Sequence, residues 1–162
     1  MKKLYYILNL ILFGGTVFAF YTVAQDFNKF YAIEWTFFKI QDCQIPNPVT
    51  TPCFWGSWAF LIALIWSLNL NKKEILTKLK SLKHLGIFLI AGTIFAWSNF
   101  SFVLFKFLKN NGQPTIGCSG QITTNPFTTP CFIGSTIFLV ALIWAWLVYF
   151  VNTRKNKIGL DQ

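Results

Sequence analysis

Charged side chains are scarce in this chain, and acidic ones are the scarcest. Charged residues make up 12% of the 162 residues, with five Asp and Glu against fourteen Lys and Arg. Soluble domains carry roughly 25% charged residues, because a small fold has a large surface to cover. Hydrophobic residues reach 54% and occur in long runs rather than in alternation, which predicts an integral membrane protein.

Many signatures of catalysis are missing as well. The sequence has one histidine, His84, and it contains no glycine-rich phosphate loop, zinc-protease motif or Ser/His/Asp set. No acid or base interrupts the long apolar runs, which argues against proton pumps and ion-coupled transporters, since these need ionisable groups inside the membrane. The net charge of +9 does not indicate nucleic-acid binding, because the chain has no soluble platform of aromatic and basic residues.

Long runs without charge are what the chain has instead, and they cover residues 4–24, 54–70, 85–105 and 132–151. A helix needs about 20 apolar residues to cross a bilayer core about 30 Å thick, so these runs predict four transmembrane helices in one all-α domain. A secretory signal peptide that ends near Ala24 is the alternative for the first run. We expect a retained helix, because Gly-Thr-Val-Phe-Ala at residues 15–19 is echoed by Gly-Thr-Ile-Phe-Ala at residues 92–96, inside a run that cannot be a signal.

A longer segment is present twice. NPVTTPCFWGSWAFLIALIW at residues 47–66 and NPFTTPCFIGSTIFLVALIW at residues 125–144 are identical at 15 of 20 positions. The duplication divides the chain into repeat A (residues 4–70), a linker (71–84), repeat B (85–151) and a tail (152–162). Each repeat is expected to be helix, loop, helix. Both would then enter the membrane in the same sense, as a parallel pseudo-two-fold four-helix bundle.

Basic residues predict how the chain is oriented. Ten of the fourteen lie at the N-terminus, in the linker or in the tail, and four lie in or beside the two longer loops. By the positive-inside rule, both termini and the linker are cytoplasmic, and the two cysteine-bearing loops are extracytoplasmic. Residues 25–52, rich in aromatic rings and acids, are expected to form an interfacial helix, a loop at headgroup level or a packed cap.

The duplicated segment has residues that are typical of helix starts. Threonine can cap the first free amide groups, and proline suits the first helical position because it has no N–H to leave unsatisfied. The Asn-Pro pairs before them indicate turns, and a glycine one turn into the helix would let a backbone or a ligand come close. The predicted helix-start motif consists of Asn47, Pro48, Thr51, Pro52 and Gly56, and of Asn125, Pro126, Thr129, Pro130 and Gly134. Capping and packing alone would also explain it.

The four cysteines are Cys43, Cys53, Cys118 and Cys131, and all lie on the predicted outer side. An even number in an oxidising compartment favours disulfides. The repeat favours the pairs Cys43–Cys53 and Cys118–Cys131, each stapling a loop to a helix start and stabilising the fold by about 3 kcal/mol. A site of four thiolates is the alternative, but the chain lacks the short Cys-x₂₋₄-Cys spacing of such sites, and we predict no metal.

Redox chemistry is a more specific interpretation of the cysteines than structural disulfides. Cys53 and Cys131 fall in the first turn of a helix, whose positive end favours a thiolate, so both are candidate catalytic residues. In topology the chain resembles membrane enzymes that pass electrons from thiols to quinones, and the vitamin K epoxide reductases. Those enzymes carry a Cys-x-x-Cys at a helix start, which this chain lacks. No cofactor is predicted, and a quinone is expected only if the redox alternative holds.

Three functions remain open from the sequence. The first is a non-enzymatic scaffold, assembly factor or partner-binding subunit, marked by buried, non-reducible bridges. The second is a membrane thiol–disulfide oxidoreductase, marked by a reducible cysteine beside an apolar cleft. The third is a small-solute permease with a cavity between the two helix starts. The expected partners are the lipid bilayer and other membrane proteins or further copies of the chain. The expected location is a prokaryotic inner membrane or plasma membrane.

Overall fold

The computed structural model describes residues 2–41, 43–70, 75–117 and 122–158. These residues form four long helices: α1 (Lys2–Glu34), α2 (Pro52–Leu70), α3 (Ile75–Lys109) and α4 (Pro130–Ile158). Each is long and apolar enough to cross a membrane, in agreement with the predicted all-α class. Short 3-10 turns η1 (Pro48–Thr50) and η2 (Pro126–Thr128) precede α2 and α4, and β1 (Thr115–Ile116) pairs antiparallel with β2 (Ile122–Thr123).

Two helices are longer than the apolar runs. α1 has 33 residues and α3 has 35, about 50 Å each at 1.5 Å per residue. Residues 25–34, expected in an interfacial segment, continue α1, and residues 75–84, expected in the linker, belong to α3. Hydropathy marks where a helix is apolar, whereas a helix continues until a residue breaks it, and residues 25–34 contain no glycine or proline.

Left-handed backbone conformations end both long helices. α1 stops at Trp35, whose φ is 57° and whose N–H bonds to the carbonyl of Tyr31 at 2.9 Å. After α3, Asn111 and Gly112 have φ values of 51° and 76°, and the N–H of Gly112 bonds to the carbonyl of Phe107 at 3.1 Å. Such residues satisfy the last free carbonyls and turn the chain away from the helix axis.

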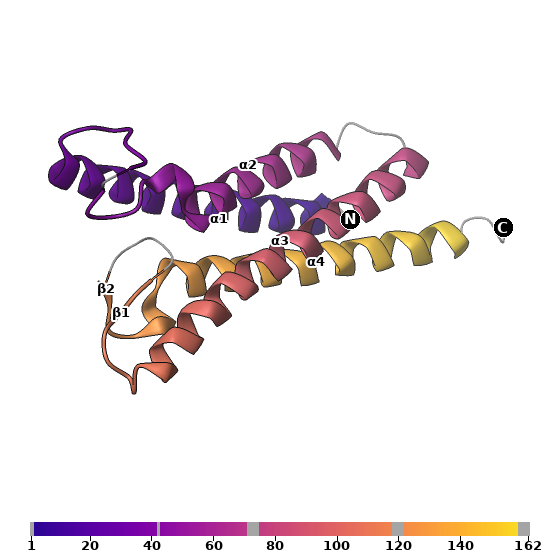
Figure 1. Cartoon of the computed structure of the whole chain (residues 1–162). Helices are drawn as coiled ribbons and strands as arrows, with labels where there is room; N and C mark the ends of the chain where they lie inside the picture. The colour runs from indigo at the N-terminus through magenta and orange to yellow at the C-terminus, as the bar shows by residue number, and fades with distance from the viewer. Residues whose placement is uncertain (1, 42, 71–74, 118–121, 159–162) are drawn as a thin grey trace.

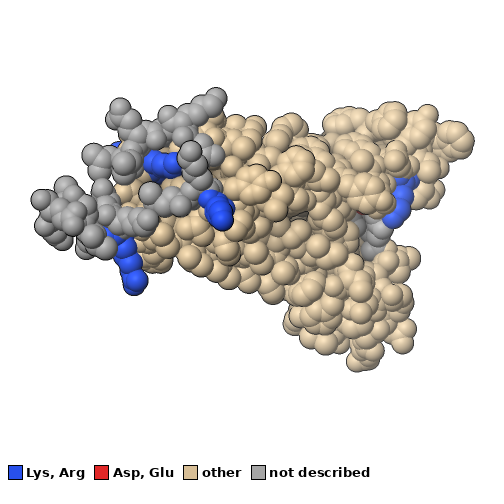
Figure 2. Space-filling view, turned by 180° about the vertical axis from the view of Figure 1, so that it is seen from behind, with Lys and Arg blue, Asp and Glu red and all other residues tan. Residues whose placement is uncertain are grey.

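The helices pack as two hairpins. α1 packs on α2, α3 packs on α4, and the hairpins join through contacts of α1 with α4 and of α2 with α3. The loops that connect α1 to η1 and α3 to η2 lie at one end, whereas α2 ends and α3 begins at the other (Figure 1). Figure 2 shows Lys and Arg gathered at the two ends of one face, with an uncharged belt between them.

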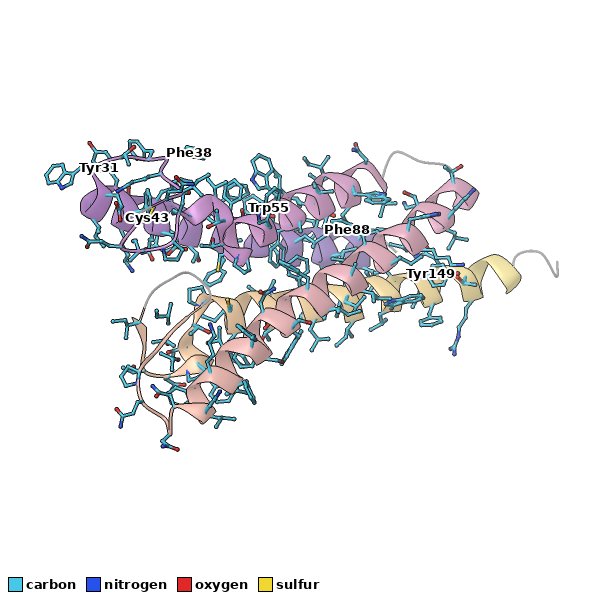
Figure 3. All side chains as sticks on the ribbon, viewed as in Figure 1. Tyr31, Phe38, Cys43, Trp55, Phe88 and Tyr149 are labelled. Atoms are coloured by element: carbon cyan, nitrogen blue, oxygen red, sulfur yellow. The ribbon has the colours of Figure 1, made fainter. Side chains whose placement is uncertain are left out.

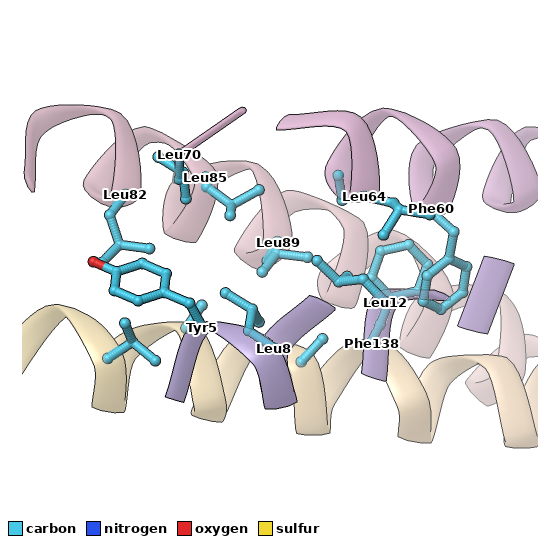
Figure 4. Close-up of a cluster of buried hydrophobic side chains, with 14 residues drawn as sticks. Tyr5, Leu8, Leu12, Phe60, Leu64, Leu70, Leu82, Leu85, Leu89 and Phe138 are labelled. Atoms are coloured by element: carbon cyan, nitrogen blue, oxygen red, sulfur yellow. The ribbon is translucent and has the colours of Figure 1, made fainter. Parts of the chain in front are cut away.

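The core runs along the middle of the bundle (Figure 4). Leu8 and Leu12 of α1 are fully buried, and so are Leu85 and Leu89 of α3, 77 positions later in each case. Phe60 of α2 and Phe138 of α4 are 2% exposed each, and their ring centroids lie 3.9 Å apart. Positions that correspond in the duplicated sequence are therefore buried together at the centre of the molecule.

Glycines admit these aromatic rings. A Cβ atom on Gly15 would lie 2.5 Å from the Phe60 ring, and one on Gly92 would lie 2.8 Å from the Phe138 ring. No side chain fits at such distances without moving the ring. α1 thus approaches α2 closely through Gly15, and α3 approaches α4 in the corresponding way through Gly92.

Candidate functional site

The two helix starts are built by the same hydrogen bonds. The side-chain oxygen of Asn47 accepts from the N–H of Val49 at 3.0 Å, and Asn125 accepts from Phe127 at 3.0 Å. The hydroxyl of Thr51 donates to the carbonyl of Pro48 at 2.6 Å. Thr129 donates to the carbonyl of Pro126, also at 2.6 Å. Asparagine and threonine thus hold a 3-10 turn directly in front of each helix.

Each helix begins at the proline of the motif. Pro52 is the first residue of α2, and Pro130 is the first residue of α4. The hydroxyl oxygens of the preceding threonines accept from the N–H groups of Phe54 at 3.5 Å and Phe132 at 3.4 Å. The same long contact is therefore present in the first turn of both helices. In each helix the cysteine is the second residue.

The structure brings the two helix-start cysteines together. The Sγ atoms of Cys53 and Cys131 lie 3.9 Å apart, although the residues are 78 positions apart in the chain. A disulfide bond is about 2.05 Å long, so these two sulfurs are in van der Waals contact and are not bonded to each other. Both side chains are half-buried, at the end of the bundle where the loops lie.

The predicted bridge between Cys43 and Cys53 does not form. Cys43 is unbridged, and its sulfur donates to the carbonyl of Lys39 at 3.1 Å. Figure 3 shows Cys43 in the loop after α1, near Tyr31 and Phe38, whereas the Cys53 sulfur faces Cys131. Spacing in the repeat suggested this pair, but the loop folds back on the end of α1 and keeps Cys43 there. Cys118 lies outside the described residues, so the bridge Cys118–Cys131 stays a prediction.

Polar contacts to the end of α1 hold this loop. The Glu34 carboxylate accepts from the backbone N–H of Gln44 and from the Lys39 ammonium, the latter at 3.1 Å. The side-chain amide of Asn47 donates to the carbonyl of Lys39 at 3.1 Å. The hydrogen bond from Gln44, and then the bond and charge of Lys39, hold the pKa of Glu34 below its usual value.

A cavity of about 70 Å³ lies between the four helices beside the two sulfurs. The ring pair of Phe60 and Phe138 forms part of its wall. Its other lining residues are Phe18, Ala19 and Thr22 of α1, Pro52, Cys53, Gly56, Ser57 and Ala59 of α2, Gly92, Phe95, Ala96 and Asn99 of α3, and Pro130, Cys131, Gly134 and Ser135 of α4. Space for about two water molecules is available, whereas a dry cavity that holds a benzene ring has about 150 Å³.

The glycines of the helix-start motif do not serve close packing. A Cβ atom on Gly56 or on Gly134 would meet no other atom within 4 Å. The adjacent serines are fully buried and donate to backbone carbonyls of their own helices, Ser57 to Phe54 at 2.7 Å and Ser135 to Phe132 at 2.9 Å. Both copies therefore keep a small residue beside open space, next to the sulfurs.

Sequence reasoning missed the residues that α1 and α3 contribute. Thr22 and Asn99 line the cavity from these helices. Asp26 is 4% exposed and lies close enough to Cys53 for their charges to interact. The uncharged run ends before Asp26, so the sequence predicted an interfacial helix, a headgroup-level loop or a packed cap for residues 25–52 and did not single out Asp26. Its spacing of one helical turn from Thr22 was the available signal, provided that α1 continues past Ala24.

No group of three or more His, Cys, Asp or Glu within the described parts of the chain is arranged to hold a metal ion. Comparison of the whole chain with models of protein families, with curated proteins and with solved structures finds no match. The function must therefore be inferred from the geometry of the site.

Proposed function

We propose that this chain is an integral membrane thiol–disulfide oxidoreductase in which Cys53 and Cys131 exchange disulfide bonds. The observation that carries the proposal is the 3.9 Å contact between their sulfurs, beside an apolar cavity that reaches all four helices. Sulfur atoms in van der Waals contact are close enough for one to attack the other after a short approach. The helix-start motif then serves to place both cysteines at the same depth.

Two features support the membrane setting. The four helices have the length and apolarity of membrane spans, and the ten clustered basic residues assign the end with both termini to the cytoplasm. The sulfurs would then face the extracytoplasmic side, where disulfides persist. Matched burial in α1 and α3, and in α2 and α4, supports two parallel copies whose pseudo-two-fold axis passes between Phe60 and Phe138.

The proposed exchange conserves atoms and electrons. The sequence predicts a disulfide between Cys118 and Cys131, and the proposed exchange begins from that bond. The Cys53 thiolate attacks the Cys131 sulfur, the Cys53–Cys131 bond forms, and Cys118 leaves as a thiolate that takes up a proton. A dithiol protein on the outer side then reduces the new bond. It becomes a disulfide itself and leaves Cys53 and Cys131 as thiols. A second, disulfide-bearing protein accepts two electrons when the Cys118–Cys131 bond is restored before the next turnover.

The competing functions have less support. The permease hypothesis expected a cavity at Gly56 and Gly134, and one lies there, but the buried rings of Phe60 and Phe138 stand on the path along the axis. The scaffold hypothesis expected buried bridges, and Cys43 is unbridged. The cavity beside the sulfurs has a volume of about 70 Å³, and we propose a dithiol protein on the outer side as the redox partner.

A cross-linking experiment tests the proposal. Cys118→Ser removes the leaving sulfur, so mild oxidation with diamide in lipid nanodiscs should join Cys53 to Cys131. Tryptic cleavage at the lysines of residues 72–83 separates the two halves of the denatured, alkylated chain unless that bond links them. We expect linked halves in Cys118→Ser and separate halves in the control Cys118→Ser/Cys53→Ser.

Reversibility decides between redox activity and a structural staple. The Cys53–Cys131 bond should titrate in glutathione buffers, whereas structural disulfides have potentials below about −300 mV. Separate halves in Cys118→Ser, or a bond that is reduced only after denaturation, would overturn the proposed function.

A further inference from the structure

We propose that Asp26 accepts the proton that Cys53 loses when its sulfur attacks Cys131. The inference rests on the thiol–disulfide exchange proposed above. It assigns a chemical role to a buried acid at the outer end of α1, beside the cysteine whose sulfur attacks.

Asp26 lies on the buried face of its helix. It is 4% exposed, and its neighbours on the same face, Val23 and Phe30, are buried as well. A carboxylate on an apolar face loses its hydration, which costs free energy unless other groups compensate. An exposed position on α1 would avoid this cost. The chain thus keeps a carboxylate at an apolar position, at a cost in hydration.

The register of α1 against α2 places Asp26 beside Cys53. The rings of Phe27 and Phe54, the residues that follow Asp26 and Cys53, pack edge to face with centroids 6.4 Å apart. Thr22, one helical turn before Asp26, lines the cavity that Cys53 also lines. The carboxylate and the thiol are near enough for their charges to interact.

The second half of the molecule lacks this acid. Leu12 of α1 corresponds to Leu89 of α3, and the same shift of 77 positions pairs Asp26 with Val103, which is also 4% exposed. Val23 likewise corresponds to Phe100, and both are buried. The position beside Cys53 therefore holds a carboxylate where the corresponding position on α3 holds two methyl groups. This difference breaks the symmetry at the sulfurs.

Proton transfer to Asp26 keeps a second negative charge from forming at the site. An apolar environment opposes a thiolate, and a neighbouring carboxylate opposes it further. When the proton moves from Cys53 to Asp26, the negative charge moves from oxygen to sulfur, and the pair carries one charge throughout. The sulfur released from Cys131 takes a proton from water. Asp26 returns its proton to Cys53 when the Cys53–Cys131 bond is reduced.

Other ionisable groups lie on the elements that pack around Asp26, and the experiment must separate them from it. On the described parts of the elements that pack around it, they are Tyr21, Lys29, Tyr31 and Glu34 of α1, Lys39 of the following loop, Cys53 of α2 and Cys131 of α4. Substitution of Asp26 alone, compared over a range of pH, isolates its contribution to the rate.

The test measures the rate of exchange in a Cys43→Ser background. Full-length protein in lipid nanodiscs is oxidised, held near pH 4 to stop exchange, and moved to a series of values between about pH 6 and 9. Acid quenching, alkylation and trypsin then report linked halves. We expect Asp26→Asn to slow exchange about 100-fold near neutral pH, the lower end of what a general base contributes, and to approach the parent rate at high pH, where hydroxide takes the proton.

Matched variants keep this test falsifiable. Asp26→Leu suits the apolar face if Asp26→Asn disturbs folding, and it should lose rate equally, whereas Asp26→Glu should restore part of it. Val103→Asn places an amide at the corresponding position of α3 and should leave the rate unchanged. A parent rate in both Asp26→Asn and Asp26→Leu, or an equal loss at every pH, would overturn the role of Asp26. No exchange in the parent protein would instead overturn the proposed function.

Discussion

At the scale of single residues, Glu34 determines where the loop after α1 lies. Its carboxylate holds the backbone of Gln44 and the ammonium of Lys39, ten and five positions further along the chain. The same loop carries Cys43, which donates to the carbonyl of Lys39. One acid beyond the uncharged run thus keeps Cys43 away from Cys53 and leaves the Cys53 sulfur to face Cys131.

We expect Glu34→Gln to release this loop at neutral pH. The pKa of Glu34 is lowered by its partners, so their stabilisation is present above the usual glutamate pKa and is lost as pH falls through the lowered value. Hydrogen exchange at the Gln44 amide, corrected for its intrinsic pH dependence, measures the effect. Protection should fall in the wild type on acidification and stay low in Glu34→Gln. Equal protection of both proteins at neutral pH would contradict the prediction.

At the scale of elements, helix pairing depends on an aromatic ring that enters a glycine site. Phe60 of α2 lies against Gly15 of α1, and Phe138 of α4 lies against Gly92 of α3. Lipid tails are as apolar as leucine, so the packing of close surfaces, rather than exclusion of water, drives helices together in a membrane. The two glycines therefore stabilise helix pairing by letting the rings come close, although they have no apolar side chain of their own.

Alanine at Gly15 should separate α1 from α2. The added Cβ would lie 2.5 Å from the Phe60 ring, and overpacking of this kind costs about 1–3 kcal/mol. Gly14→Ala is the matched control, because no atom lies within 4 Å of its Cβ position and alanine has the better helix propensity. Unfolding of the two variants in mixed detergent micelles measures the difference. A Gly15→Ala protein as stable as Gly14→Ala would refute this account of pairing.

At the scale of the whole molecule, four antiparallel helices bring both duplicated corners to one end. The contact between Cys53 and Cys131 requires this arrangement, since each is the second residue of its helix. The end where α1 begins and α4 ends lies opposite (Figure 1). Any orientation in a membrane therefore places the two corners on the same side.

Labelling from outside the cell tests the orientation inferred from the basic residues. In variants with one cysteine each, Cys43 and an engineered Gln113→Cys should react with an impermeant maleimide in intact cells. Lys78→Cys, near the start of α3, should react only after the membrane is permeabilised. Gln113 is exposed in the loop after α3, so its accessibility depends on the side of the membrane. Labelling of the two loops from opposite sides would contradict the parallel arrangement.

The sequence by itself was enough to predict four apolar helices, because a long uncharged run can be recognised without knowing which residues contact it in the fold. The duplicated helix starts were equally visible, since capping and turn chemistry act within a few residues. The ends of α1 and α3 were not predicted, because polar helical turns beyond the apolar run carry no hydropathy signal.

Only the tertiary structure decided which sulfurs meet and where Asp26 lies. Spacing along the chain favoured Cys43 with Cys53, whereas the register between the two hairpins, determined by Phe60, Phe138 and the glycines they contact, places Cys53 against Cys131. That register depends on how surfaces far apart in the sequence pack against each other. Short-range patterns do not contain this information, so the site could be found only after the helices were placed.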